Sequence, residues 1–183
     1  MKKFFTIFFS TILFLCSLSA EDPYDLHLAS VVIDPENPLK GKITLSNGSI
    51  WNWSPTCNCC KGKLDDWKEG DPLKIGKIQG KEYGILNLSV LHRMNRMTLD
   101  ESTLTVFPTI EKVDDNAHYL LLSDGSLWYI GWWSSQAVKD WKVGEHILVT
   151  QAKTIGEATH ILFNLHREKS IFWDTSSANA TLR

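Results

Sequence analysis

Residues 45–51 read Leu-Ser-Asn-Gly-Ser-Ile-Trp, and residues 122–128 read Leu-Ser-Asp-Gly-Ser-Leu-Trp. In both stretches an Asn-Gly or Asp-Gly pair stands between apolar residues. This is the strongest short-range signal for a β-hairpin, because both turn residues must tolerate a positive φ angle. A two-residue turn would place Leu45 opposite Ile50, facing inward, and Trp51 on the opposite face, with the second stretch arranged in the same way. A turn with a bulge would shift one arm and change this assignment.

A second pair of matching stretches extends the repeat. Residues 66–71 read Asp-Trp-Lys-Glu-Gly-Asp, and residues 140–145 read Asp-Trp-Lys-Val-Gly-Glu. The same offset aligns Leu91-His92-Arg93 with Leu165-His166-Arg167. Several matches near one period indicate an internal duplication, so we expect two copies of one module of about 75 residues.

Each module is expected to be all-β. The pattern predicts an opening strand (26–33 or 104–113), the hairpin, a helical turn ending at Gly70 or Gly144, and two further strands. About five short strands with one helical turn are typical of a small barrel of SH3-like or OB-like kind. The predicted boundaries are a signal peptide over 1–20, a first module over 21–99, a second over 100–174, and a flexible polar tail over 175–183.

The N-terminus has the pattern of a signal peptide. Lys2 and Lys3 precede an apolar run over 4–16, and Ser17-Leu18-Ser19-Ala20 suits cleavage after Ala20. The run is shorter than the roughly 20 apolar residues that a retained spanning helix needs. A lipoprotein site at Cys16 is disfavoured because a bulky leucine precedes it. We therefore expect a bacterial protein that is exported to the periplasm or secreted, with no transmembrane segment in its mature chain.

Composition narrows the possible functions. The chain has 183 residues, 43% of them hydrophobic, and a net charge of -2, which becomes -4 without the two leader lysines. This excludes collagen-like and wholly disordered classes, and it disfavours nucleic-acid binding by phosphate neutralisation. No catalytic or phosphate-binding motif is present, so no catalytic residue and no cofactor is predicted. His160 and His166 would share a strand face, but two imidazoles do not define a metal site.

The first module carries a cysteine-rich insertion between its hairpin and its Asp-Trp turn. Cys57, Cys59 and Cys60 are the only cysteines outside the leader, so no distant partner is available for a disulfide across the core. Four interpretations stay open. They are a strained local disulfide, an intermolecular cross-link that gives a disulfide-linked oligomer, a soft-metal site for Cu(I) or Zn(II), and thiol redox or nucleophilic chemistry.

The tryptophans divide into shared and unshared positions. Those common to both copies are expected to pack, with Trp51 or Trp128 against Trp67 or Trp141. The second copy also contains the run Trp-Tyr-Ile-Gly-Trp-Trp over 128–133. Alternation cannot bury all of these rings on one face, so at least one should be exposed or lie at an interface.

Packing or contact between the modules is the favoured role for these rings. The functional alternative is an aromatic platform for a sugar ring or an extended peptide, and its candidate residues are Trp53, Trp132 and Trp133. The sequence thus favours an exported, non-catalytic binding or structural protein with a protein or glycan partner in the envelope or host. The alternative is a small thiol-dependent redox or soft-metal-binding protein that uses the cysteine cluster.

Overall fold

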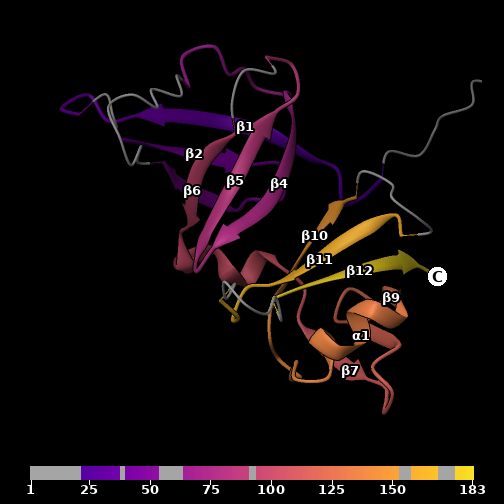
Figure 1. Cartoon of the computed structure of the whole chain (residues 1–183). Helices are drawn as coiled ribbons and strands as arrows, with labels where there is room; N and C mark the ends of the chain where they lie inside the picture. Colours follow the sequence, from indigo (N-terminus) through magenta and orange to yellow (C-terminus); the bar gives the residue numbers. More distant parts are fainter. Residues whose placement is uncertain (1–21, 38–39, 54–63, 91–93, 153–157, 169–175) are drawn as a thin grey trace, which may run out of the picture.

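A computed structural model describes residues 22–183 except for 38–39, 54–63, 91–93, 153–157 and 169–175 (Figure 1). The predicted signal peptide and all three loop cysteines lie outside these described residues. Two antiparallel sheets follow one another along the chain, each with six strands. The all-β fold of two tandem barrel-like modules is confirmed, with six strands in each where about five were expected.

The first sheet closes into a barrel with the strand order β1-β2-β3-β6-β5-β4. Its strands are β1 (Leu26–Ile33), β2 (Gly41–Leu45), β3 (Ile50–Trp53), β4 (Pro72–Gln79), β5 (Glu82–Asn87) and β6 (Asn95–Leu99). A short 3-10 helix, η1 (Glu101–Val106), leads from the barrel to the second sheet.

The second sheet has the order β10-β11-β12-β9-β8-β7. Its elements are β7 (Ile110–Val113), β8 (Tyr119–Leu122), β9 (Leu127–Ile130), α1 (Trp132–Val138), β10 (Ile147–Gln151), β11 (His160–Asn164) and β12 (Ser177–Leu182). A bridge between Thr109 and His146 joins its two edges at one end, so the sheet curls into a half-barrel. The predicted opening strand over 104–113 is thus only partly strand, because η1 occupies its first residues.

The prediction of a flexible tail over 175–183 is wrong. Residues 177–182 form β12, which pairs with β11 on one side and β9 on the other. Ala178 and Ala180 are buried in the second core, while Asn179 between them is exposed. Their cross-strand partners are the larger Leu162, His160 and Ile130, so small apolar residues fit between these neighbours.

Both duplicated hairpins contain one residue more than a two-residue turn. The amide of Leu45 bonds to the carbonyl of Ser49 at 2.9 Å, and Gly48 has a φ of 84°. Ile43 therefore pairs with Trp51, so both face inward and Ile50 does not. The second hairpin repeats this geometry, pairing Leu120 with Trp128. The predicted outward position of the two tryptophans is wrong, because the bulge shifts the second arm by one residue.

Each buried indole has the same hydrogen-bonded support. Trp51 Nε1 donates to Ser49 Oγ at 2.9 Å, and that hydroxyl donates to Asn47 Oδ1 at 2.7 Å. In the second module Trp128 Nε1 donates to Ser126 Oγ at 2.8 Å. As expected, the shared tryptophans are buried, Trp51 with Trp67 in one core and Trp128 with Trp141 in the other. Trp51 also meets Tyr83 edge-on at 5.1 Å, and Trp128 meets His160 edge-on at 5.0 Å.

A carboxylate and a buried asparagine close each module at a second shared position. Asn87 Nδ2 donates to Asp71 Oδ2 at 2.7 Å, and Asn164 Nδ2 donates to Glu145 Oε2 at 2.7 Å. Asn164-Leu165 is therefore the structural counterpart of Asn87-Leu88. Residues 91–93, which are predicted to match Leu165-His166-Arg167, lie outside the described residues.

These bonds predict acid sensitivity. Burial acts to raise the pKa of Glu145, but hydrogen bonds from the Lys142 amide and Asn164, and the Arg167 guanidinium, lower it below its usual 4.5. A folded-state pKa below the unfolded value gives stability that is present at neutral pH and lost as pH falls through the folded pKa. We expect the free energy of unfolding to fall between about pH 5 and pH 3.

Chemical denaturation across this pH range measures the effect. Asn164→Leu should lower the free energy of unfolding at neutral pH by about 1–3 kcal/mol. The further loss of this free energy on acidification should be smaller in the variant than in the unchanged protein. Asn87→Leu is the matched variant in the first module, where Asp71 also has a lowered pKa that burial opposes and Asn87 supports. An unchanged acid slope in both variants would contradict the assignment.

The two modules share a packed boundary. Leu148 of β10 and Phe163 of β11 belong to the apolar core of the first barrel, whereas their neighbours Ile147 and Leu162 belong to the second core. Phe163 meets Tyr83 of β5 edge-on, with ring centroids 6.1 Å apart. Alternating side chains of the β10–β11 hairpin thus point into two different cores.

The segment before β1 also crosses this boundary. Tyr24 packs edge-on against Trp128 at 5.2 Å, and its hydroxyl donates to Asp124 Oδ2 at 2.9 Å. Asp22 Oδ2 lies 2.8 Å from Nε2 of the buried His160. Burial raises the pKa of Tyr24 to about 12, so its hydroxyl keeps its proton at neutral pH.

Candidate functional site

Trp132 and Trp133 form an exposed aromatic pair at the start of α1. Their side chains are 62% and 85% exposed, and their rings meet edge-to-face with centroids 4.5 Å apart. Exposure of at least one ring in the 128–133 run is thereby confirmed. Trp53, the third predicted platform residue, is only 5% exposed. It lies in β3, pairs with Met97 and belongs to the first core, so its assignment to an exposed surface is wrong.

The pair lies beside a hollow of about 510 Å³. This aromatic groove is formed by α1, the end of β9 and the outer face of β12. Its lining residues are Tyr129, Gly131, Trp132, Trp133, Ser134, Ala158, Asn179, Ala180, Thr181 and Arg183. Rings therefore lie next to amide, hydroxyl and guanidinium groups, a combination typical of ligand sites.

Local contacts hold α1 in place over β12. The helix begins after Gly131, and its buried side is occupied by Ser135 and Val138. The amide of Asn179 donates to Ser134 Oγ at 3.1 Å. Because the inward positions are already filled, the two tryptophans at the start of the helix remain in solvent.

Arg183 and Tyr129 provide the polar side of the aromatic groove. The Arg183 guanidinium lies over the Tyr129 ring, 5.1 Å from its centroid, in a cation–π contact. The Arg183 amide donates to the Leu127 carbonyl at 2.9 Å, which fixes the backbone beside β9. Tyr119 supports Tyr129 from the next strand, with ring centroids 5.6 Å apart.

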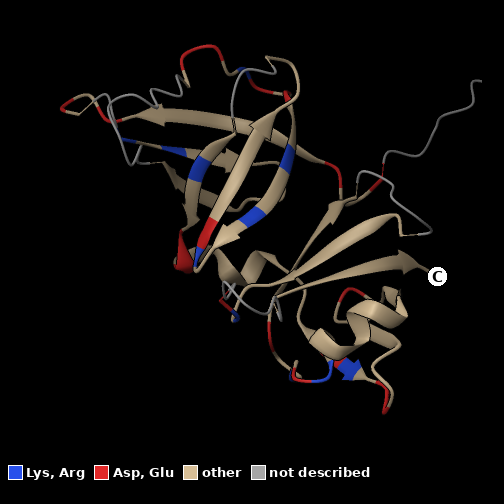
Figure 2. Cartoon of the chain, viewed as in Figure 1, with Lys and Arg blue, Asp and Glu red and all other residues tan. Residues whose placement is uncertain are grey.

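The surroundings of the aromatic groove are nearly neutral. Strands β10, β11 and β12 contain no Lys, Arg, Asp or Glu, and Figure 2 shows them as uncharged ribbons. Both strands that floor the groove are also fully paired, since β12 lies between β11 and β9, and β9 lies between β12 and β8. The floor therefore offers no open strand edge to a ligand.

The other predicted residues do not form a metal site among the described residues. His160 contacts Asp22, while His166 Nε2 lies 3.0 Å from His146 Nδ1, so the two histidines engage different partners. Burial and the neighbouring His166 lower the pKa of His146. No group of three or more His, Cys, Asp or Glu side chains is arranged to hold a metal there. Cys57, Cys59 and Cys60 lie outside the described residues.

Sequence reasoning missed Asn179, Thr181 and Arg183, because their segment was predicted to be a tail. The signal was present in Ser-Ala-Asn-Ala-Thr-Leu over 177–182, where apolar and polar residues alternate as in a half-buried strand. The small side chains of the two alanines made this alternation weak.

Comparisons with protein-family models, curated proteins and solved structures found no match to this chain. Among the described residues, no helix has both the length and the apolar character needed to cross a membrane.

Proposed function

We propose that this protein is an exported, non-catalytic binding protein of the bacterial envelope that takes up a carbohydrate chain in its aromatic groove. The observation that carries the proposal is the exposure of the adjacent Trp132 and Trp133 beside a polar hollow. Large exposed aromatic surfaces are uncommon on monomeric proteins and mark interaction sites. The export rests on the leader sequence described above.

The chemistry of the lining supports a sugar. The apolar C–H face of a sugar ring can cover an indole, while its hydroxyls need hydrogen-bond donors and acceptors at the edge. Asn179, Thr181 and Arg183 contribute such groups to the lining of the groove. The neutral strands around them suit an uncharged ligand better than a polyanion.

Two further observations favour a glycan ligand over other roles. An extended peptide that binds by adding a strand needs an open sheet edge, and the floor of the groove has none. The exposed pair is also not part of the repeated scaffold. At an offset of 77, the first module has Pro55 and Thr56 where the second has Trp132 and Trp133.

Retention on insoluble peptidoglycan, chitin and cellulose tests the proposal. We expect the purified chain to bind at least one of these polymers, and Trp132→Ala with Trp133→Ala to weaken binding about tenfold or more. The melting temperature should change little, because both rings are mostly solvated. Val143→Ala is the matched control, since this apolar side chain is 70% exposed and lies in the turn before β10.

Three outcomes would contradict the proposal. The first is no retention on any polymer, and the second is equal retention of the double variant. The third is binding of a proline-rich peptide, but of no glycan, in the same groove, since proline-rich segments also dock on aromatic surfaces.

A further inference from the structure

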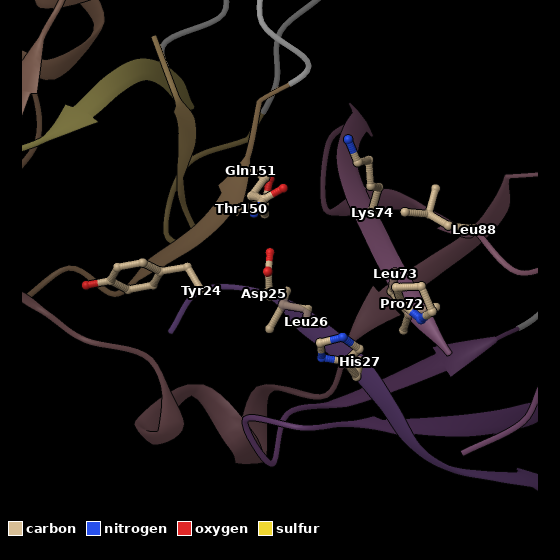
Figure 3. Close-up of a pocket in the computed structure, with 10 residues that line it drawn as sticks. All are labelled: Tyr24, Asp25, Leu26, His27, Pro72, Leu73, Lys74, Leu88, Thr150 and Gln151. Atoms are coloured by element: carbon tan, nitrogen blue, oxygen red, sulfur yellow. The ribbon is translucent and has the colours of Figure 1, made fainter. Parts of the chain in front are cut away.

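A second hollow lies where the two modules meet, separate from the aromatic groove (Figure 3). This boundary cleft has a volume of about 170 Å³, enough for several waters or one small molecule. One wall is the start of β1, another is β4, and the third is the end of β10. Its lining residues are Tyr24, Asp25, Leu26, His27, Pro72, Leu73, Lys74, Leu88, Thr150 and Gln151.

Thr150 presents a buried hydroxyl without a hydrogen-bond partner. The residue is 4% exposed, and its Oγ1 is the one buried side-chain polar atom that lacks a partner among the described residues. Thr150 shares a face of β10 with Leu148, the face that packs against the first barrel. An unpaired buried hydroxyl is unfavourable for folding, so a residue of this kind is expected at a site that a ligand completes.

Opposite charges line the cleft without neutralising each other. Asp25 and Lys74 are both half-buried, and no ion pair or side-chain hydrogen bond involves either in the described part of the chain. Figure 3 shows the Asp25 carboxylate pointing toward Thr150 and Gln151, while Lys74 rises from β4 on the facing wall. Charged groups that are partly removed from water are normally paired, so both are available to a ligand.

The remaining lining limits the size and shape of this ligand. Leu26 and Leu73 pair across β1 and β4, are buried in the first core and also line the cleft, so part of its lining is apolar. A ligand that fits must be small, with a cationic end and an anionic end separated by a short apolar or neutral part.

We infer that the boundary cleft binds a free α-amino acid. Its ammonium group pairs with the Asp25 carboxylate, its carboxylate pairs with the Lys74 ammonium, and Thr150 supplies a hydrogen bond beside them. The site draws on both modules, since Asp25 and Lys74 come from the first and Thr150 from the second. Neither module alone contains it.

Calorimetry with the full mature chain and a panel of free L-amino acids tests this inference. We expect at least one amino acid to bind and to raise the melting temperature. Its N-acetyl derivative, which lacks the ammonium, and its amide, which lacks the carboxylate, should each bind at least tenfold more weakly. No binding by any amino acid, or equal binding of either derivative, would overturn the inference.

Variants test whether Asp25 and Lys74 bind the ligand directly or whether any loss of one charge weakens binding. Asp25→Asn and Lys74→Gln keep the side-chain size and should each weaken binding at least tenfold. Asp115→Asn and Lys112→Gln are matched controls, because both residues are exposed and lie away from the cleft. Unchanged binding in the first pair, or equal losses in both pairs, would contradict the assignment.

Thr150→Val distinguishes a role of the hydroxyl in binding from a role in the fold alone. The substitution keeps the branched shape but removes the unpartnered hydroxyl, so the melting temperature of the free protein should stay the same or rise. Binding of the amino acid should weaken in the same variant. A lowered melting temperature with unchanged binding would show that the hydroxyl serves the fold alone.

Discussion

Trp128→Ala is expected to lower the free energy of unfolding by about 3–5 kcal/mol. The side chain is fully buried in the second core and packs against Tyr24 and His160, so its removal leaves a large cavity there. The substitution also removes the donor to Ser126 Oγ. Urea denaturation, followed by the fluorescence of the remaining tryptophans, measures the loss.

Trp51→Ala is the matched variant in the first module. Trp51 is equally buried and donates to Ser49 in the same way, so we expect a loss of similar size. Val143→Ala serves as the exposed control and should change the stability by no more than about 0.5 kcal/mol. A loss below about 1 kcal/mol at either tryptophan would contradict the inward register of the hairpins.

Phe163→Ala is expected to lower the stability by about 3–5 kcal/mol and to uncouple the unfolding of the two modules. The ring lies on β11 but packs in the first core, against Tyr83. Its loss removes apolar contact between the barrels while leaving the second core filled. Scanning calorimetry should then show two transitions, whereas we expect the unchanged protein to show one.

Leu162→Ala is a sharp control because it is the neighbouring residue on the same strand. Its side chain points into the second core, so it should destabilise that module by about 2–5 kcal/mol without removing contacts at the boundary. A single transition in Phe163→Ala, or the same splitting in both variants, would argue against a boundary held by Phe163.

The duplication and the strand character of the chain could be predicted without coordinates. The Asn-Gly and Asp-Gly turns identify both hairpins, because few residues other than glycine accept the positive φ found at Gly48 and Gly125. The repeated Trp67 and Trp141 were expected to pack, and both are buried. The exposure of Trp132 or Trp133 followed from the number of rings that one strand face can hold.

The register of the hairpins could not be predicted in the same way. Two turns that differ by one residue are both compatible with the same local sequence, yet they place Trp51 on opposite faces. The choice depends on how the ring packs against Tyr83 and on the partner of its indole N–H. Both depend on the folded arrangement of the chain, so local sequence propensity does not predict them.

The residues that form the boundary between the modules could not be predicted from the sequence either. Leu148 and Leu162 are ordinary apolar strand residues in the sequence, but one enters the first core and the other the second. The boundary cleft arises from the same docking, since it joins residue 25 before β1, residue 74 of β4 and residue 150 of β10.

The sequence by itself determined that the chain contains two similar β-modules and that the second has more rings over 128–133 than one strand face can bury. Periodicity and turn chemistry are local properties, so they can be read along one chain. The tertiary structure alone decided the inward register of the repeated tryptophans, the sixth strand of each sheet and the cleft where the modules meet. These features depend on which strand faces are brought together. Both faces of the β10–β11 hairpin are buried only when the first barrel packs against the face that the second core leaves open.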